Sequence, residues 1–160
     1  MIIFADFYRD HKDRLLAYLL RMTGDYELSC DLMQESFTRC LERYGWKGLT
    51  SSLLFTVARN AVYDHGRRRQ VRQRSDRKRC QGPDNPEEHH LLREEYQRVL
   101  TAMQQLEPDE KDLLSLAATS IYSYREIAQQ AGISEANVKV KVHRARIKLK
   151  KLLGEGSHHG

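Results

Sequence analysis

Basic side chains gather on a predicted helix near the end of the chain, where they could bind the phosphates and base edges of duplex DNA. The apolar residues of this helix recur at intervals of four, three, four and three, which predicts one buried stripe: Val138, Val142, Ala145, Leu149 and Leu152. The other faces carry Lys139, Lys141, His143, Arg144, Arg146, Lys148, Lys150 and Lys151. A helix anchored in a core with a basic outer surface is typical of one that enters a major groove.

The residues before this basic helix predict a helix-turn-helix. Ser123 and Glu126 stand at the spacing of a capping box, in which each side chain accepts a hydrogen bond from the other residue's backbone N–H. Gly132 is expected to end that first helix, and Ser134 is a candidate N-cap for the basic helix. Both helix starts are therefore marked in the sequence.

The charge of the chain is unevenly distributed. Residues 67–79 hold eight Arg or Lys and one Asp, residues 139–151 hold seven Arg or Lys and no acid, and the whole chain carries +5. Each basic segment thus contributes +7, which leaves −9 for the remainder. Such separation is expected of a protein that touches a polyanion in two places and presents a different surface to another partner. Two solvated helix faces remain the alternative.

Composition favours an all-α protein of one or two domains. The 160 residues include only three prolines and no sustained alternation of apolar and polar residues. No window approaches the roughly 18 apolar residues of a membrane span, and the N-terminus lacks a signal-peptide pattern, so a cytoplasmic location is expected. Three cysteines without C-x-x-C spacing fit a reducing compartment, and we assign them no role.

Three predicted helices can share an N-terminal core, and they are joined by Thr23-Gly-Asp25 and by a loop at 44–52. These helices span about Ile3–Met22, Tyr26–Arg43 and Ser52–Arg68. Ser51 or Ser52 is the expected cap of the third helix. We expect a helical domain at 1–69, a flexible basic linker at 70–88, a helix-turn-helix domain at 89–154 and a disordered tail at 155–160.

Two parts of the chain resemble one protein family. The segment Asp31-Leu-Met-Gln-Glu-Ser-Phe37, then Phe55–Asp64 with Arg67-Arg-Arg69 behind it, is similar to region 2 of bacterial sigma factors of the extracytoplasmic-function (ECF) class. Leu106-Glu-Pro108 through Arg146 resembles region 4 of the same class, and together the two cover almost the whole chain. The resemblance implies a transcription initiation factor, not an enzyme, whose partners are core RNA polymerase, promoter DNA and an anti-sigma factor. It implies no cofactor, metal, small-molecule substrate or membrane insertion.

The second predicted helix is the expected polymerase contact. An exposed stripe follows i, i+3, i+4 and i+8 and comprises Asp31, Gln34, Glu35 and Arg39. Family resemblance places the clamp helices of the polymerase's largest-subunit pair against it. A solvated face with internal pairs, such as Glu35 with Arg39, is the alternative.

The resemblance also implies that the N-terminal and C-terminal halves of the chain each bind DNA. Minus-10 DNA is expected at aromatic, polar and basic residues of the loop and third helix: Tyr44, Trp46, Lys47, Arg59, Asn60, Tyr63, Arg67 and Arg68. Minus-35 DNA is expected at Asn137, Lys139, Lys141, His143 and Arg144 in the groove, with Tyr124, Arg125 and Arg146 at the backbone. Leu53 and Thr56 depart from the family's usual tryptophan and basic residue. Val140 stands where the family often has a small polar residue, and it could contact a thymine methyl group or merely pack.

Other functions remain possible from sequence. The helix-turn-helix alone is equally similar to LuxR-type response regulators, and a DNA-binding regulator with sigma-like architecture would not act as a polymerase subunit. No strand alternates with helix in residues 1–70, which disfavours the receiver domain of a response regulator. A helical nuclease lacks the needed cluster of carboxylates, His or Cys, and His89, His90, His158 and His159 form no plausible metal-ligand spacing.

Overall fold

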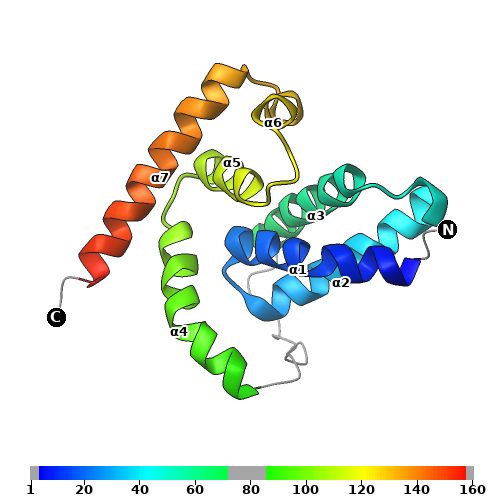
Figure 1. The fold of residues 1–160 in the computed structure, drawn as a ribbon, viewed down its shortest axis with the longest axis horizontal. Coiled ribbons are helices and arrows are strands. Elements are labelled where there is room, and N and C mark those ends of the chain that lie inside the picture. The colour runs from blue at the N-terminus through cyan, green and yellow to red at the C-terminus, as the bar shows by residue number, and fades with distance from the viewer. Residues whose placement is uncertain (1–3, 72–85, 158–160) are drawn as a thin grey trace. The chain divides into compact units, whose positions relative to one another are not determined.

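The protein is all-α in the part of the chain that the structure describes, as the sequence predicts. The computed structural model describes residues 4–71 and 86–157, which form seven α-helices and one short 3-10 helix and contain no strand (Figure 1). None of the helices in these ranges is long and apolar enough to cross a membrane. The chain divides into two compact units, Met1–Gly82 and Pro83–Gly160.

The first unit is a bundle in which three helices contact one another in pairs. Its elements are α1 (Phe4–Thr23), α2 (Tyr26–Tyr44), η1 (Trp46–Gly48) and α3 (Ser51–Val71). At one end Phe37 of α2 lies edge-on to Phe7 of α1, with ring centroids 6.2 Å apart. Deeper in the bundle Tyr18 of α1 lies 5.7 Å from Phe55 of α3, and both side chains are fully buried. These aromatic contacts fix how α2 and α3 lie against α1.

The start of α3 differs from the prediction that Ser51 or Ser52 would cap it. Thr50 is the cap instead, because its Oγ1 accepts a hydrogen bond from the backbone N–H of Leu53 at 3.1 Å. The hydroxyl of Ser51 has another partner, Nε2 of His11, at 2.6 Å. Since His11 also contacts the Phe7 carbonyl through Nδ1, it ties α1 to the first residue of α3.

The second unit packs its other helices against the long last one. Its elements are α4 (Pro86–Met103), α5 (Pro108–Ala118), α6 (Tyr124–Ala131) and α7 (Glu135–Ser157), and α4, α5 and α6 each contact α7. Pro108 stands at the first turn of α5, as predicted, where its missing N–H costs no helical hydrogen bond. Fully buried residues from all four helices make the core, among them Met103, Leu116, Ile127, Val138 and Val142.

Both ends of the predicted linker and the start of the predicted tail are helical. The helix α3 continues to Val71 and α4 begins at Pro86, while residues 72–85 lie outside the described part of the chain. The helix α7 runs to Ser157, three residues into the segment 155–160 that we expected to be disordered. A glycine weakens a helix by only about 1 kcal/mol, so Gly154 and Gly156 do not end it.

Candidate nucleic-acid and protein interfaces

Local hydrogen bonds set the start of α7, as the sequence predicts. The N–H of Glu126 donates to Ser123 Oγ at 3.1 Å, and the N–H of Ser123 donates to Glu126 Oε1 at 2.9 Å. Gly132 then ends α6 with a φ of 70°, a left-handed conformation that favours glycine. After the turn, Ser134 Oγ accepts from the N–H of Asn137 at 3.1 Å. The first turn of α7 is thereby held at a defined position relative to α6.

The outer face of α7 presents most of the side chains that we predicted to face a DNA groove. The side chains of Val138, Val142 and Ala145 are fully buried against the other helices of the unit. The exposed residues of the predicted groove set are Asn137, Lys139, His143 and Arg144. Lys139 pairs with Glu135 at 3.8 Å on the same helix. His143 and Arg144 make no side-chain hydrogen bond or ion pair with any residue in 4–71 or 86–157. Arg144 thus keeps all its donors for a ligand.

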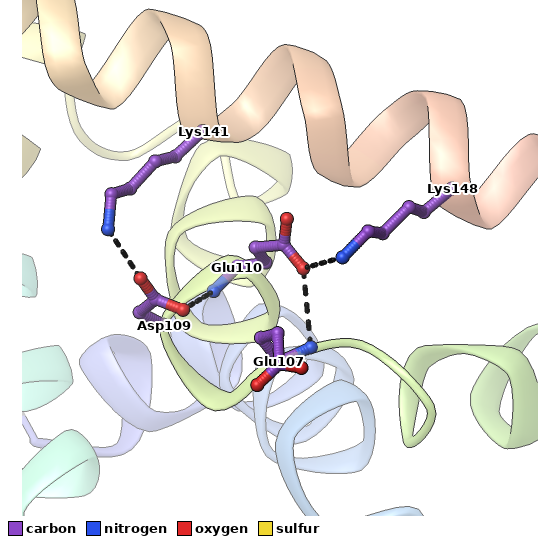
Figure 2. A network of polar contacts seen from close by, with 5 residues as sticks. All are labelled: Glu107, Asp109, Glu110, Lys141 and Lys148. Carbon is purple, nitrogen blue, oxygen red and sulfur yellow. Dashed lines mark hydrogen bonds and ion pairs between the residues drawn. The ribbon is translucent and has the colours of Figure 1, made fainter.

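Lys141 was predicted to face the groove, but it points to the side of α7 that meets α5. Its Nζ contacts Asp109 Oδ2 at 2.5 Å, and only 34% of its side chain is exposed. Two turns later, Nζ of Lys148 contacts Glu110 Oε1 at 2.9 Å (Figure 2). A residue three positions after buried Val138 lies on the flank of the helix, which is why Lys141 reaches α5. In this structure Lys141 therefore joins α7 to α5, and its contact with a DNA base stays a prediction.

These two ion pairs neutralise the acidic start of α5. The carboxylates of Asp109 and Glu110 lie in the first turn of α5, where the helix dipole also favours negative charge. The Glu110 side chain is only 11% exposed and also accepts from the N–H of Glu107 at 3.3 Å. The hydrogen bond from Lys141 lowers the pKa of Asp109 below its ordinary value. Asp109 therefore stays ionised and keeps Lys141 attached at neutral pH.

The residues predicted to hold the DNA backbone lie where α6 approaches α7. Arg146 of α7 donates from Nη1 to the Tyr124 hydroxyl at 3.4 Å, and the Arg146 side chain remains exposed. Arg125, in the first turn of α6, is also exposed. The structure thus brings Tyr124 and Arg146 together beside the exposed face of α7.

On α2, the predicted polymerase contact separates into two parts. Asp31 and Gln34 are exposed, and Gln34 Nε2 reaches the Tyr8 hydroxyl at 3.5 Å. Glu35 pairs with Arg39 at 2.7 Å, and Arg39 extends toward Asp64 of α3 at 3.8 Å. The acidic, hydrogen-bonding end of the stripe therefore faces outward, while Arg39 links α2 to α3.

The residues predicted to bind minus-10 DNA lie on α3, at the end of α2 and in η1. Tyr44 and Tyr63 are 39% and 37% exposed, which is unusual for large apolar rings in this structure. The guanidinium of Arg59 lies 5.3 Å from the Tyr63 ring centroid, a cation–π contact. The remaining predicted residues with described side chains, Lys47, Asn60 and Arg67, are all exposed. The side chains of Trp46 and Arg68 lie outside the described set.

Family models match both units separately. The sigma-70 region 2 model matches residues 7–72, which fall in the first unit, and the sigma-70 region 4 model matches residues 96–149, which fall in the second. The chain is 30% identical over 156 residues to the RNA polymerase sigma factor CarQ of Myxococcus xanthus, covering 95% of this chain and 90% of that protein. It is 31% identical over 156 residues to the ECF RNA polymerase sigma factor SigM of Bacillus subtilis, covering 94% and 95%. The chain belongs to the ECF sigma factors.

A solved structure shares the fold of this sigma factor. The sigma factor RpoE, crystallised with the anti-sigma factor NepR from Bartonella quintana, has a TM-score of 0.66, and the match covers 93% of this chain and 97% of that one. At 21% identity this likeness shows the fold alone. The region 2 match in residues 7–72 disfavours the LuxR-type alternative, which the helix-turn-helix by itself left open.

Sequence reasoning on this sigma factor missed the acidic partners of its basic residues. Asp109 and Asp64 were not predicted to matter, yet they hold Lys141 and Arg39 respectively. One usable signal was the acidic first turn of α5, because two carboxylates at a helix start favour a nearby cation. The partner itself lies 32 residues away in sequence and depends on how α5 packs on α7.

Proposed function

We propose that this protein is a transcription initiation factor that binds core RNA polymerase and directs it to a specific set of promoters. The observation that carries the proposal is the match of both units, in order, to sigma-70 regions 2 and 4. Two curated relatives that align over nearly the whole chain are named RNA polymerase sigma factors. A sigma factor acts by binding, so we assign the protein no reaction of its own.

The polymerase is proposed to dock on the exposed part of α2. Asp31 and Gln34 offer an acid and an amide on one exposed surface, which suits a basic helical partner. Glu35 and Arg39 already form an ion pair with each other. We therefore expect them to shape this surface and not to form new ion pairs with the polymerase.

We propose that each of the two units binds promoter DNA. In the first, Tyr44, Asn60, Tyr63 and Arg59 offer rings for stacking, an amide for a base edge and a cation for phosphate, as single-stranded minus-10 DNA requires. In the second, α7 would enter the major groove of the minus-35 element with Asn137, His143 and Arg144 toward the bases. Because polymerase and promoters are its proposed partners, we also propose a cytoplasmic location.

An anti-sigma factor is the third proposed partner. The similar RpoE structure is a complex with the anti-sigma factor NepR, which supports a partner of this kind here. The exposed faces of α2 and α7 are the surfaces that such a regulator would cover here.

Run-off transcription with purified core polymerase tests the proposal. The full chain and core enzyme are mixed with genomic promoter fragments, and transcripts are compared with those from core alone. We expect discrete transcripts whose start sites share one upstream element. If the chain does not bind core, or binds core without producing promoter-specific transcripts, the proposal fails.

A further inference from the structure

The exposed face of α7 carries apolar side chains among its cations. Val140 and Ile147 are 44% and 54% exposed, and no other large apolar side chain between Glu94 and Gly154 is as exposed. Neither is needed for the core of this unit, which α7 reaches through Val138, Val142 and Ala145 on its opposite side. Single exposed apolar side chains are common on protein surfaces, so the neighbours of each one decide whether it can meet a ligand.

Val140 shares a stripe with two residues suited to read bases. Asn137, Val140 and Arg144 follow one another at i, i+3 and i+7, so their Cα atoms rise by about 4.5 Å and 6 Å along the helix. Base pairs are stacked about 3.4 Å apart, so neighbouring members of this stripe would meet base pairs that are at most about two steps apart. Asn and Arg are the residues that pair bidentately with adenine and guanine in the major groove.

The surroundings of Val140 favour nucleic acid over an apolar protein surface as its occupant. No acidic residue lies between Glu135 and Gly154 of α7. The exposed cations and imidazole around the stripe are Lys139, His143, Arg144, Lys150 and Lys151. Such a surface attracts a polyanion. In the major groove of DNA, the apolar group that distinguishes one base from the others is the 5-methyl of thymine. Valine has one strongly preferred rotamer in a helix, so its methyl groups are already ordered before contact.

We propose that Val140 is a specificity-determining residue that contacts the 5-methyl group of a thymine in the minus-35 duplex. The inference rests on the proposed function, since it places α7 in that groove. Val140 would thus select thymine at one position through an apolar contact, without a hydrogen bond. The thymine belongs to a base pair within about two steps of the pairs read by Asn137 and Arg144.

Replacing thymine by deoxyuridine tests this, because the exchange removes the methyl group and leaves base pairing unchanged. Promoter duplexes are first selected from a library with a random minus-35 element by the full chain bound to core polymerase. Each thymine of the selected element is then replaced singly by deoxyuridine, and affinity is measured by competition. We expect one position at which the wild type binds about fourfold more weakly, the factor for burying one methyl group.

Two variants make the assignment specific. Val140→Ala should bind the thymine and deoxyuridine duplexes equally, while Ile147→Ala, an equally exposed apolar truncation two turns along α7, should keep the wild-type discrimination. Both sites are exposed, so thermal unfolding should change little in either variant. The inference is overturned if no deoxyuridine position weakens wild-type binding, or if Val140→Ala still discriminates. Failure to select any promoter would instead count against the proposed function.

Discussion

Lys141 of α7 is paired with Asp109 of α5, while Arg144, one turn later on α7, has no side-chain partner in residues 4–71 and 86–157. Two cations of one basic helix therefore have different surroundings. Lys141 forms an ion pair within the second unit, where it joins α7 to α5. The five N–H donors of Arg144 remain available to a ligand. The number of basic residues on α7 is therefore larger than the number that are unpaired and available to DNA.

Truncation of each cation should separate these roles. Arg144→Ala should cost on the order of 1–3 kcal/mol of specific minus-35 binding, because it removes a candidate bidentate contact to guanine. Lys141→Ala should leave sequence preference unchanged. Competition binding against a scrambled minus-35 duplex measures both. Equal loss on both duplexes would make Arg144 a phosphate contact, and lost preference in Lys141→Ala would return Lys141 to the groove.

Removal of the Asp109 charge should destabilise the second unit in a pH-dependent way. The pKa of Asp109 is lowered in the folded state, chiefly by the hydrogen bond from Lys141. Its stabilisation is therefore complete above the unfolded pKa of about 3.9 and is lost as pH falls through the lower folded pKa. At pH 7, Asp109→Asn should lower the free energy of unfolding by up to about 1 kcal/mol, because the pair is partly exposed.

Urea unfolding at pH 7 and at pH 2.5, followed by helical circular dichroism, checks this. The difference between wild type and Asp109→Asn should shrink at the lower pH. Glu95→Gln is the matched control, since Glu95 is exposed on α4 and has no ion pair in the described part of the chain. A difference that stays constant with pH would mean that the ion pair does not stabilise the fold.

Two glycines of the second unit should respond oppositely to alanine. Gly132 has a φ of 70° and nothing within 4 Å of an added Cβ, so alanine there costs backbone strain of about 1–2 kcal/mol without a clash. Gly154 lies within α7 with equally open space, so alanine should stabilise that helix by about 0.5–1 kcal/mol. Thermal unfolding of the full chain measures both. The same sign of effect for both variants would contradict the assigned conformations.

Charge reversal on α2 should weaken polymerase binding. Asp31→Lys places a cation where a basic partner is proposed, and like charges in contact cost several kcal/mol, so affinity for core should fall at least about tenfold at low salt. Asp13→Lys makes the same charge change at an exposed residue of α1. Titration of labelled protein with core polymerase compares the two. Equal losses would show a general charge effect and remove Asp31 from the interface.

The sequence predicts features that depend on residues close together in the chain better than features that depend on residues far apart. The caps at Ser123 and Ser134 and the turn at Gly132 depend on residues within one helical turn, and the structure has them as predicted. The predicted Ser51 or Ser52 cap was wrong, because a histidine 40 residues earlier takes the Ser51 hydroxyl.

The exposed residues of α7 also show that contacts between distant parts of the chain are hard to predict from sequence. Helical periodicity separates the buried stripe from the outer faces, and it correctly leaves Arg144 and His143 outside. It cannot say which flank of α7 another helix will cover. The contact of Lys141 with Asp109 could not be predicted for that reason, since Asp109 comes within reach only when α5 packs on α7.

Loss of the Tyr63 ring should weaken capture of single-stranded minus-10 DNA. The ring is 37% exposed, and Arg59 lies over it at 5.3 Å, which holds a cation beside a surface on which a base can stack. Base stacking on an aromatic side chain is worth about 1–3 kcal/mol, so Tyr63→Ala should bind about fivefold more weakly or worse. Tyr63→Phe keeps the ring and should bind like the wild type.

The measurement is fluorescence anisotropy of a labelled non-template minus-10 strand bound to the full chain with core polymerase. Duplex minus-35 affinity, measured in parallel, should not change in either variant, because Tyr63 belongs to the first unit. If the alanine variant binds the single strand as well as the wild type does, the Tyr63 ring is not a stacking platform. If the phenylalanine variant also fails, the hydroxyl is the contact, and recognition there depends on a hydrogen bond.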